Sequence, residues 1–179
     1  MQNVPELAHK TLLPLCSPMS GAIQTAEHRR SARAIEAHLE KGESVVYLTL
    51  GDPTIYSTFS YLQHLLEVDG YTVEIVSGVP SFCAAAARLH LPLAQWDEQL
   101  HILPALHITQ AELAYPGNCV LMKSASHMKD VKSLLRRSGR TVRAVEHCSC
   151  PEEKVYYDLE EIPDDAGYFS LVIAREPEE

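Results

Sequence analysis

Residues 44–59 read SVVYLTLGDPTIYSTF, an apolar stretch followed by Gly-Asp-Pro. Its first part, Ser44–Leu50, is a continuous apolar run. A run of this kind is typical of a β-strand that is buried on both faces. Gly51 follows directly, and a glycine allows the chain to leave a strand with dihedral angles that other residues avoid. We therefore expect a buried strand that ends in a turn at Gly51, Asp52 and Pro53.

Helices and strands alternate around this strand in the first half of the chain. Apolar residues three or four positions apart predict the helices, and glycine or proline ends them. The predicted helices cover Ala26–Glu40, Thr58–Val68 and Ser81–Leu89, and the predicted strands cover Thr72–Val76 and Gln99–Leu103. This alternation implies right-handed βαβ units and a parallel sheet, in which ligands bind at the carboxyl ends of the strands.

The second half of the chain has more strands and fewer helices. Before it, Thr109 and Glu112 have the spacing of a capping box on a short helix. Consecutive strands favour a mixed sheet. We therefore predict an α/β protein with an N-terminal α/β domain over residues 1–106 and a C-terminal α/β domain over residues 107–179. The predicted elements of the second half are a helix at Met128–Arg137 and strands at Cys119–Met122, Thr141–Glu146, Lys154–Asp158 and Tyr168–Ala174.

Composition excludes several classes of protein. The chain has 179 residues and a net charge of −9, so we expect no broad nucleic-acid surface. No run approaches the ~20 apolar residues of a membrane helix. The first residues, MQNVPELAHK, lack the basic and apolar regions of a signal peptide, and the five cysteines are irregularly spaced. Reduced thiols and a cytoplasmic location are therefore expected.

Two loops are candidate ligand sites because each follows a predicted strand. In the first, Asp52 can accept hydrogen bonds from a ligand hydroxyl or amino group, although Gly-Asp-Pro also suits a plain turn. In the second, Ser77–Ser81, backbone N–H groups at the start of the following helix can bind a ligand oxygen. The small residues Cys83–Ala87 of that helix are equally compatible with tight packing on a sheet.

Other familiar site patterns are missing from the sequence. It contains neither G-x-G-x-x-G nor G-x-x-x-x-G-K-[ST], so hydride and phosphoryl transfer lack their usual loops. His147–Cys150, which reads HCSC, is the best candidate for a metal cluster. A zinc site usually takes about four ligands from two spaced pairs, and no second pair matches. We expect no metal.

Several of these motifs together resemble the class III, or tetrapyrrole, methyltransferases. They are LGDPTIYST at 50–58, GVPSFCAAAARLHLPLA at 78–94 and VLMKS at 120–124. The ending EEKVYYDLEEIPDDAGYFSLVIARE at 152–176 is similar to the precorrin-2 (or cobalt-factor II) C20-methyltransferase branch. The resemblance implies two α/β domains with S-adenosylmethionine in the cleft between them, usually as a homodimer. It also implies methyl transfer to a tetrapyrrole carbon during cobalamin biosynthesis.

The resemblance assigns cofactor contacts by position, and it assigns no catalytic residue. Two departures stand out: Pro80 occupies a position where relatives usually have threonine, and the family's opening strand with its Gly-Pro-Gly-Asp-Pro loop has no counterpart here. The N-terminal domain is therefore expected to be incomplete. The implied cofactor-binding residues are Leu50, Gly51, Asp52, Ile55, Tyr56, Pro80, Ser81, Met122 and Cys148.

Three functions remain open from the sequence. The first is methylation of C20, in which alignment of the methyl group with the attacking carbon supplies most of the rate and the proton acceptor is unassigned. The second is a truncated, non-catalytic homologue that binds S-adenosylmethionine or a partner chain. The third is an oligomeric interaction module, because an incomplete sheet invites pairing with another chain.

Overall fold

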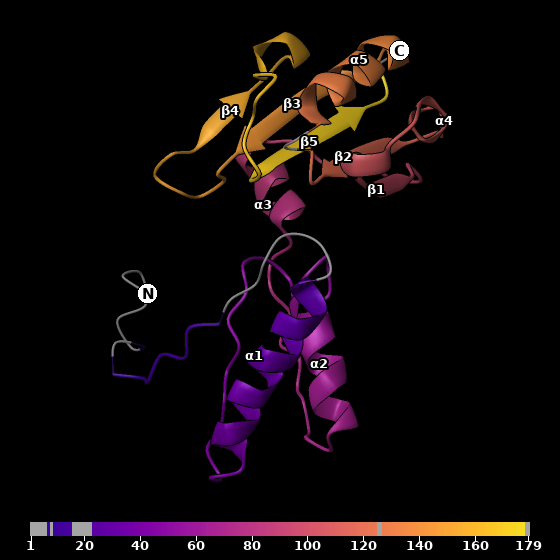
Figure 1. Cartoon of the computed structure of the whole chain (residues 1–179). Coiled ribbons are helices and arrows are strands. Elements are labelled where there is room, and N and C mark those ends of the chain that lie inside the picture. Colours follow the sequence, from indigo (N-terminus) through magenta and orange to yellow (C-terminus); the bar gives the residue numbers. More distant parts are fainter. Residues whose placement is uncertain (1–6, 8, 16–22, 125–126, 178–179) are drawn as a thin grey trace. The chain divides into compact units, whose positions relative to one another are not determined.

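The computed structural model describes residues 7, 9–15, 23–124 and 127–177. The chain forms two compact units, Met1–Gly78 and Val79–Glu179, and each is described separately below (Figure 1). These units part at Gly78, whereas the sequence suggests a domain boundary at residue 106. The two-domain assignment by residue number stays a prediction.

Two amphipathic helices build the N-terminal unit, residues 1–78. They are α1, Ile23–Leu39, and α2, Phe59–Val68, which confirm the two helices predicted there within a few residues. Ala32 and Ile35 of α1 pack with Leu62 and Leu66 of α2 in a small apolar core. Spacings of three and four residues place each pair on one face of its helix, so each helix buries one stripe against the other.

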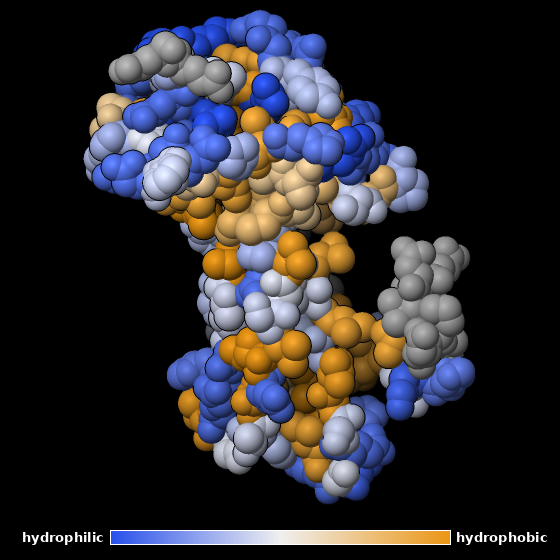
Figure 2. Space-filling model, turned by 180° about the vertical axis from the view of Figure 1, so that it is seen from behind, coloured by the Kyte–Doolittle hydropathy of each residue, from blue (hydrophilic) through white to orange (hydrophobic). Residues whose placement is uncertain are grey.

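Two predicted strands of this unit are wrong. Ser44–Leu50 and Thr72–Val76 are extended, but neither pairs with another segment, and the described part of the unit contains no strand. Val45 and Tyr47 pack toward the helices while the alternate side chain of Val46 is 80% exposed. A strand requires a neighbour for its backbone N–H and C=O groups, and none pairs with these segments in the described residues. Figure 2 shows hydrophobic residues on the surface of this unit.

A mixed five-stranded sheet organises the C-terminal unit, residues 79–179. Its order is β1-β2-β5-β3-β4, and β1 pairs with β2 in parallel while the other neighbours are antiparallel. The predicted mixed sheet is confirmed. The strand predicted near residue 100 also forms, but it joins this sheet instead of an N-terminal one. The strands are β1 Leu100–Pro104, β2 Asn118–Met122, β3 Thr141–Glu146, β4 Lys154–Tyr156 and β5 Ser170–Arg175.

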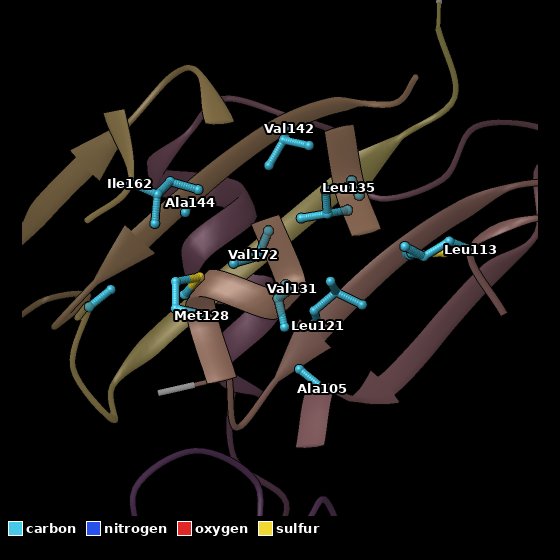
Figure 3. Close-up of a cluster of buried hydrophobic side chains, with 13 residues drawn as sticks. Ala105, Leu113, Leu121, Met128, Val131, Leu135, Val142, Ala144, Ile162 and Val172 are labelled. Carbon is cyan, nitrogen blue, oxygen red and sulfur yellow. The ribbon is translucent and has the colours of Figure 1, made fainter. Parts of the chain in front are cut away.

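Helices cover this sheet on both faces. Helix α5, Met128–Ser138, buries Met128, Val131 and Leu135 against Leu121 and Val172 of the central strands (Figure 3). The sequence predicts this helix to within a residue. Helix α3, Ser81–Arg88, packs against β3 and β5 and buries Phe82, Ala85 and Ala86. The central strand β5 is therefore buried along most of its length, as its apolar sequence requires.

Short helices complete the connections. Helix α4, Gln110–Leu113, begins with the predicted capping box, in which the Thr109 backbone N–H donates to the Glu112 carboxylate at 2.6 Å. Two turns of 3-10 helix, Ala105–His107 (η2) and Leu159–Glu161 (η4), lie after β1 and after β4. Within the described residues, no helix combines the length and the apolar character that crossing a membrane requires.

Candidate functional site

Within the N-terminal unit, Asp52 forms hydrogen bonds with the turn that it belongs to and with Ser77 and Gly78 at the end of the unit. Its Oδ1 accepts hydrogen bonds from the Thr54 backbone N–H at 2.8 Å and from the Thr54 hydroxyl at 2.5 Å. Its Oδ2 accepts hydrogen bonds from the Ser77 hydroxyl at 2.7 Å and from the Gly78 backbone N–H at 2.9 Å. One carboxylate thus connects the loop after residue 50 with the loop after residue 76.

These four hydrogen bonds use the accepting capacity of Asp52. A carboxylate offers about four lone-pair sites, and four donors of the protein fill them. Hydrogen bonds from the Thr54 and Ser77 hydroxyls, together with the Thr54 and Gly78 N–H groups, hold the pKa of Asp52 well below its usual range. Asp52 is buried and charged, so the sequence-based idea that it is free to accept from a ligand does not describe this geometry. Its assignment to the cofactor contacts stays a prediction.

Two glycines allow this close approach of the loops. Gly51 has φ of 82°, a left-handed conformation that suits glycine. A Cβ atom on Gly78 would overlap the carbonyl oxygen of Gly51. The result is a tight turn beside which Leu50 is 86% exposed and Tyr56 is 45% exposed, while Ile55 is half-buried. Five of the residues predicted to contact a cofactor, Leu50, Gly51, Asp52, Ile55 and Tyr56, therefore lie in this turn, and the side chains of Leu50 and Tyr56 are exposed.

Pro80 and Ser81 start helix α3 of the C-terminal unit. The Pro80 carbonyl accepts hydrogen bonds from the Cys83 N–H at 2.9 Å and from the Ala84 N–H at 3.2 Å. Pro80 has no N–H of its own, so any ligand oxygen at this terminus meets one donor fewer. Of the small residues Cys83–Ala87, Ala85 and Ala86 are buried and serve the tight packing that the sequence leaves open, whereas Cys83 and Ala87 are exposed.

Met122 ends strand β2, where it lies opposite Pro104 of β1. It is half-buried, and the next residue, Lys123, turns the chain sharply with φ of 60°. The carboxyl end of a parallel pair is a common place for ligands in α/β sheets. Met122 accordingly lies at a suitable point in the fold for its predicted contact.

Cys148 lies in a strained loop between β3 and β4. Its neighbours His147 and Ser149 have φ of 51° and 65°, values that residues other than glycine seldom adopt. The His147 N–H donates to the Phe169 carbonyl at 3.1 Å, and the Ser149 N–H donates to Glu153 Oε2 at 2.8 Å. Left-handed residues of this kind persist where the surroundings hold them, and they gather at functional sites.

Glu146 is a buried acid that no sequence motif indicates as a site residue. Its Oε1 accepts from the Gly167 N–H at 2.7 Å, and its Oε2 accepts from the Tyr156 hydroxyl at 3.1 Å. Burial favours a higher pKa for Glu146, but these hydrogen bonds outweigh it and hold the pKa below its ordinary value. Burial and the hydrogen bond to Glu146 raise the pKa of Tyr156 to about 12. An acid at the end of a strand, followed later by Ala-Gly-Tyr, is the only sequence signal that we find for this contact.

The described residues contain no cluster of three or more histidine, cysteine or acidic side chains that could hold a metal ion. Cys83, Cys119, Cys148 and Cys150 are free thiols. Cys16 lies outside the described residues.

The candidate contacts thus lie in the loops after residues 50 and 76, at the start of helix α3 and after strands β2 and β3 of an α/β protein. The family model of the tetrapyrrole (corrin/porphyrin) methylases matches residues 3–163. The chain therefore belongs to this family, as the sequence motifs indicate.

Within this family, three curated relatives are similar in sequence over most of this chain. A Salmonella typhimurium protein named "Cobalt-precorrin-2 C(20)-methyltransferase" is 33% identical over 180 residues, covering 94% of this chain and 75% of its own length. A Methanocaldococcus jannaschii protein named "Probable cobalt-precorrin-2 C(20)-methyltransferase" is 35% identical over 145 residues, or 79% of this chain. A Sinorhizobium protein named "Precorrin-2 C(20)-methyltransferase" is 32% identical over 152 residues, or 82% of this chain. The chain spans only 63% and 61% of the lengths of the last two.

Solved structures share the fold. A cobalt precorrin-4 methyltransferase superposes with a TM-score of 0.71 at 21% identity, over 82% of this chain and 70% of its own. A uroporphyrin-III C-methyltransferase from Thermus thermophilus, complexed with S-adenosyl homocysteine, has a TM-score of 0.66 at 24% identity, over 87% of this chain and 74% of its own. The predicted tetrapyrrole methylase-like fold is thereby confirmed.

Proposed function

We propose that the protein transfers a methyl group from S-adenosylmethionine to C20 of a tetrapyrrole, precorrin-2 or cobalt-factor II, in cobalamin biosynthesis. The names of the three curated relatives support this reaction. Within the structure, the observation that carries the proposal is the Asp52 connection. The hydrogen bonds of Asp52 fix the turn after residue 50, which the family motif assigns to the methyl donor.

The cofactor-contacting residues follow the same proposal. Asp52 orients the turn from inside, and the backbone and exposed side chains of the turn contact the methyl donor. S-adenosylmethionine supplies an electrophilic methyl group on a sulfonium, and the electron-rich tetrapyrrole carbon attacks it. Since such a displacement depends mainly on alignment, the protein's contribution is to bind and orient both partners. The proposed contacts are Leu50, Gly51, Asp52, Ile55, Tyr56, Pro80, Ser81, Met122 and Cys148.

Binding of S-adenosylhomocysteine tests the cofactor assignment. At about 100 times its dissociation constant, a ligand adds about 2.7 kcal/mol to the free energy of unfolding. For a chain of this size we expect the melting temperature to rise by about 5–10 °C. Calorimetric titration should show heat at one site per chain. No heat and no shift would refute the proposal.

Methyl transfer to reduced precorrin-2 and to cobalt-factor II then tests the reaction. We expect a product that is 14 mass units heavier, roughly the mass of one CH2 group, with S-adenosylhomocysteine released in equal amount. Binding of the cofactor without any transfer would favour the non-catalytic homologue.

We also propose a cytoplasmic homodimer, by analogy with the family. Light scattering on a size-exclusion column should then give twice the chain mass of 19.9 kDa. A mass of one chain over a wide concentration range would refute the dimer.

A further inference from the structure

An ion pair connects the end of helix α3 to the strained Cys148 loop. Arg88, the last residue of the helix, donates from Nε to Glu153 Oε1. The other oxygen of Glu153 accepts the Ser149 N–H at 2.8 Å. One carboxylate thus holds both the helix and the loop, and it is well shielded because the Glu153 side chain is only 18% exposed.

The loop needs such an anchor. Two of its residues, His147 and Ser149, are left-handed without being glycine, and this conformation costs free energy. Glu153 restrains the loop at Ser149, and the Phe169 carbonyl restrains it at His147. Cys148 lies between these two restraints. The position of the Cys148 backbone therefore depends on Glu153.

Helix α3 links Arg88 to Ser81, which is another residue predicted to contact the cofactor. It is only eight residues long, with Ser81 at its first position and Arg88 at its last. Its small residues Ala85 and Ala86 are buried, and the helix packs against β3 and β5. A packed helix of two turns moves as one body, so fixing Arg88 also restrains Ser81.

We propose that Arg88 and Glu153 are positioning residues for the methyl donor. Glu153 sets the Cys148 loop, and Arg88 sets Glu153 relative to helix α3, so that the loop and the start of the helix keep a fixed separation. This inference rests on the proposed function, because both segments are proposed cofactor contacts. Neither Arg88 nor Glu153 needs to touch the cofactor.

Calorimetric titration of the full chain with S-adenosylhomocysteine tests the pair. We expect Arg88→Ala to weaken binding about 3-fold, since the guanidinium is half exposed. Glu153→Ala removes the anchor as well and should weaken binding about 10-fold. The double variant should resemble Glu153→Ala instead of reaching the product of about 30-fold, because coupled residues are not additive.

A second ion pair of the same unit is the matched control. Arg136 Nε donates to Glu160 at 2.6 Å, and the two side chains are 49% and 62% exposed. Arg136→Ala and Glu160→Ala remove a more exposed ion pair that includes no residue of the Cys148 loop or of helix α3. They should leave the affinity for S-adenosylhomocysteine unchanged.

Rescue and kinetics separate positioning from a general loss of structure. Arg88→Lys should recover part of the affinity, because an ammonium can still pair with Glu153. Glu153→Gln, which keeps the size of the side chain, should fall between the wild type and Glu153→Ala. In the methyl-transfer assay, KM for S-adenosylmethionine should rise more than kcat falls.

The outcomes are distinct. If the unaltered protein binds S-adenosylhomocysteine, and Glu153→Ala and Glu153→Gln bind it with the same affinity as the unaltered protein, the positioning role is refuted and the proposed function stands. If the unaltered protein gives neither heat nor a rise in melting temperature with S-adenosylhomocysteine, the proposed function itself fails. A loss of affinity in the Arg136→Ala control as large as in Arg88→Ala would also overturn the positioning role.

Discussion

Removing the buried carboxylate of Glu146 should lower the free energy of unfolding of the C-terminal unit, because two hydrogen bonds lose their acceptor. Glu146→Ala leaves the Gly167 N–H and the Tyr156 hydroxyl without their acceptor. Each hydrogen bond to a charged group contributes about 1.5–3 kcal/mol, and partial access to water places both bonds near the lower limit. We expect a loss of about 3 kcal/mol in the free energy of unfolding, since the two contributions add to that value.

Glu146→Gln separates the effect of the negative charge from the effect of the two hydrogen bonds. The glutamine oxygen can still accept from the Gly167 N–H, and its amide can donate to the Tyr156 hydroxyl oxygen. Only the charge is lost, so we expect about 1 kcal/mol. Lys154 lies 3.8 Å from Glu146 with a side chain that is 62% exposed, so Lys154→Met should change stability by less than about 0.5 kcal/mol.

Urea denaturation followed by circular dichroism gives these differences. A loss of about 3 kcal/mol corresponds to a fall of about 6–12 °C in melting temperature for a chain of this length. The reasoning is refuted if Glu146→Ala unfolds within 0.5 kcal/mol (roughly the experimental error) of the unaltered protein. Equal losses in Glu146→Ala and Glu146→Gln would show that charge, and not the two hydrogen bonds, decides the effect.

Three further tests concern the pH dependence of the Glu146 contribution, the close contact at Gly78 and the buried side chain of Leu135. Because the folded state lowers the pKa of Glu146, the ionised side chain stabilises the fold above its ordinary pKa of 4.5, and this stabilisation is lost as the pH falls below that value. The difference in free energy of unfolding between the unaltered protein and Glu146→Gln should therefore shrink toward pH ~3. Urea denaturation at several pH values measures this difference. Gly78→Ala should displace the loop that Asp52 holds, because the added methyl overlaps the Gly51 carbonyl, and calorimetry should show weaker binding of S-adenosylhomocysteine. Leu135→Ala, at a side chain that is 1% exposed, should cost about 2–5 kcal/mol in urea denaturation without changing that affinity.

Local signals explain what could be predicted from the sequence. Helix α5 has apolar residues at helical spacing and a glycine at its end, and Gly139 adopts φ of 69° there. The capping box at Thr109 and Glu112 is likewise a contact between residues three positions apart. Such features depend on neighbours along the chain, so a single sequence reveals them.

Non-local pairing explains the failures. Ser44–Leu50 has the composition of a buried strand, but composition does not show whether a partner strand lies beside it. The bond from Arg88 to Glu153 joins residues 65 positions apart, and no spacing rule connects them. The sequence indicates Asp52 as a candidate site residue, but the hydrogen bonds from Ser77 and Gly78 that occupy its carboxylate depend on a turn that only the folded chain reveals.

The extended segments of the N-terminal unit have a practical consequence for handling the protein. Val46, Leu48 and Val76 are 80%, 62% and 78% exposed, on backbone that pairs with no other described segment. Extended, apolar backbone with unused hydrogen-bonding groups is a template for self-association into cross-β aggregates. Precipitation should therefore rise steeply with protein concentration. Val46→Lys should reduce this self-association, because a charged side chain on the extended segment disfavours pairing with a second chain.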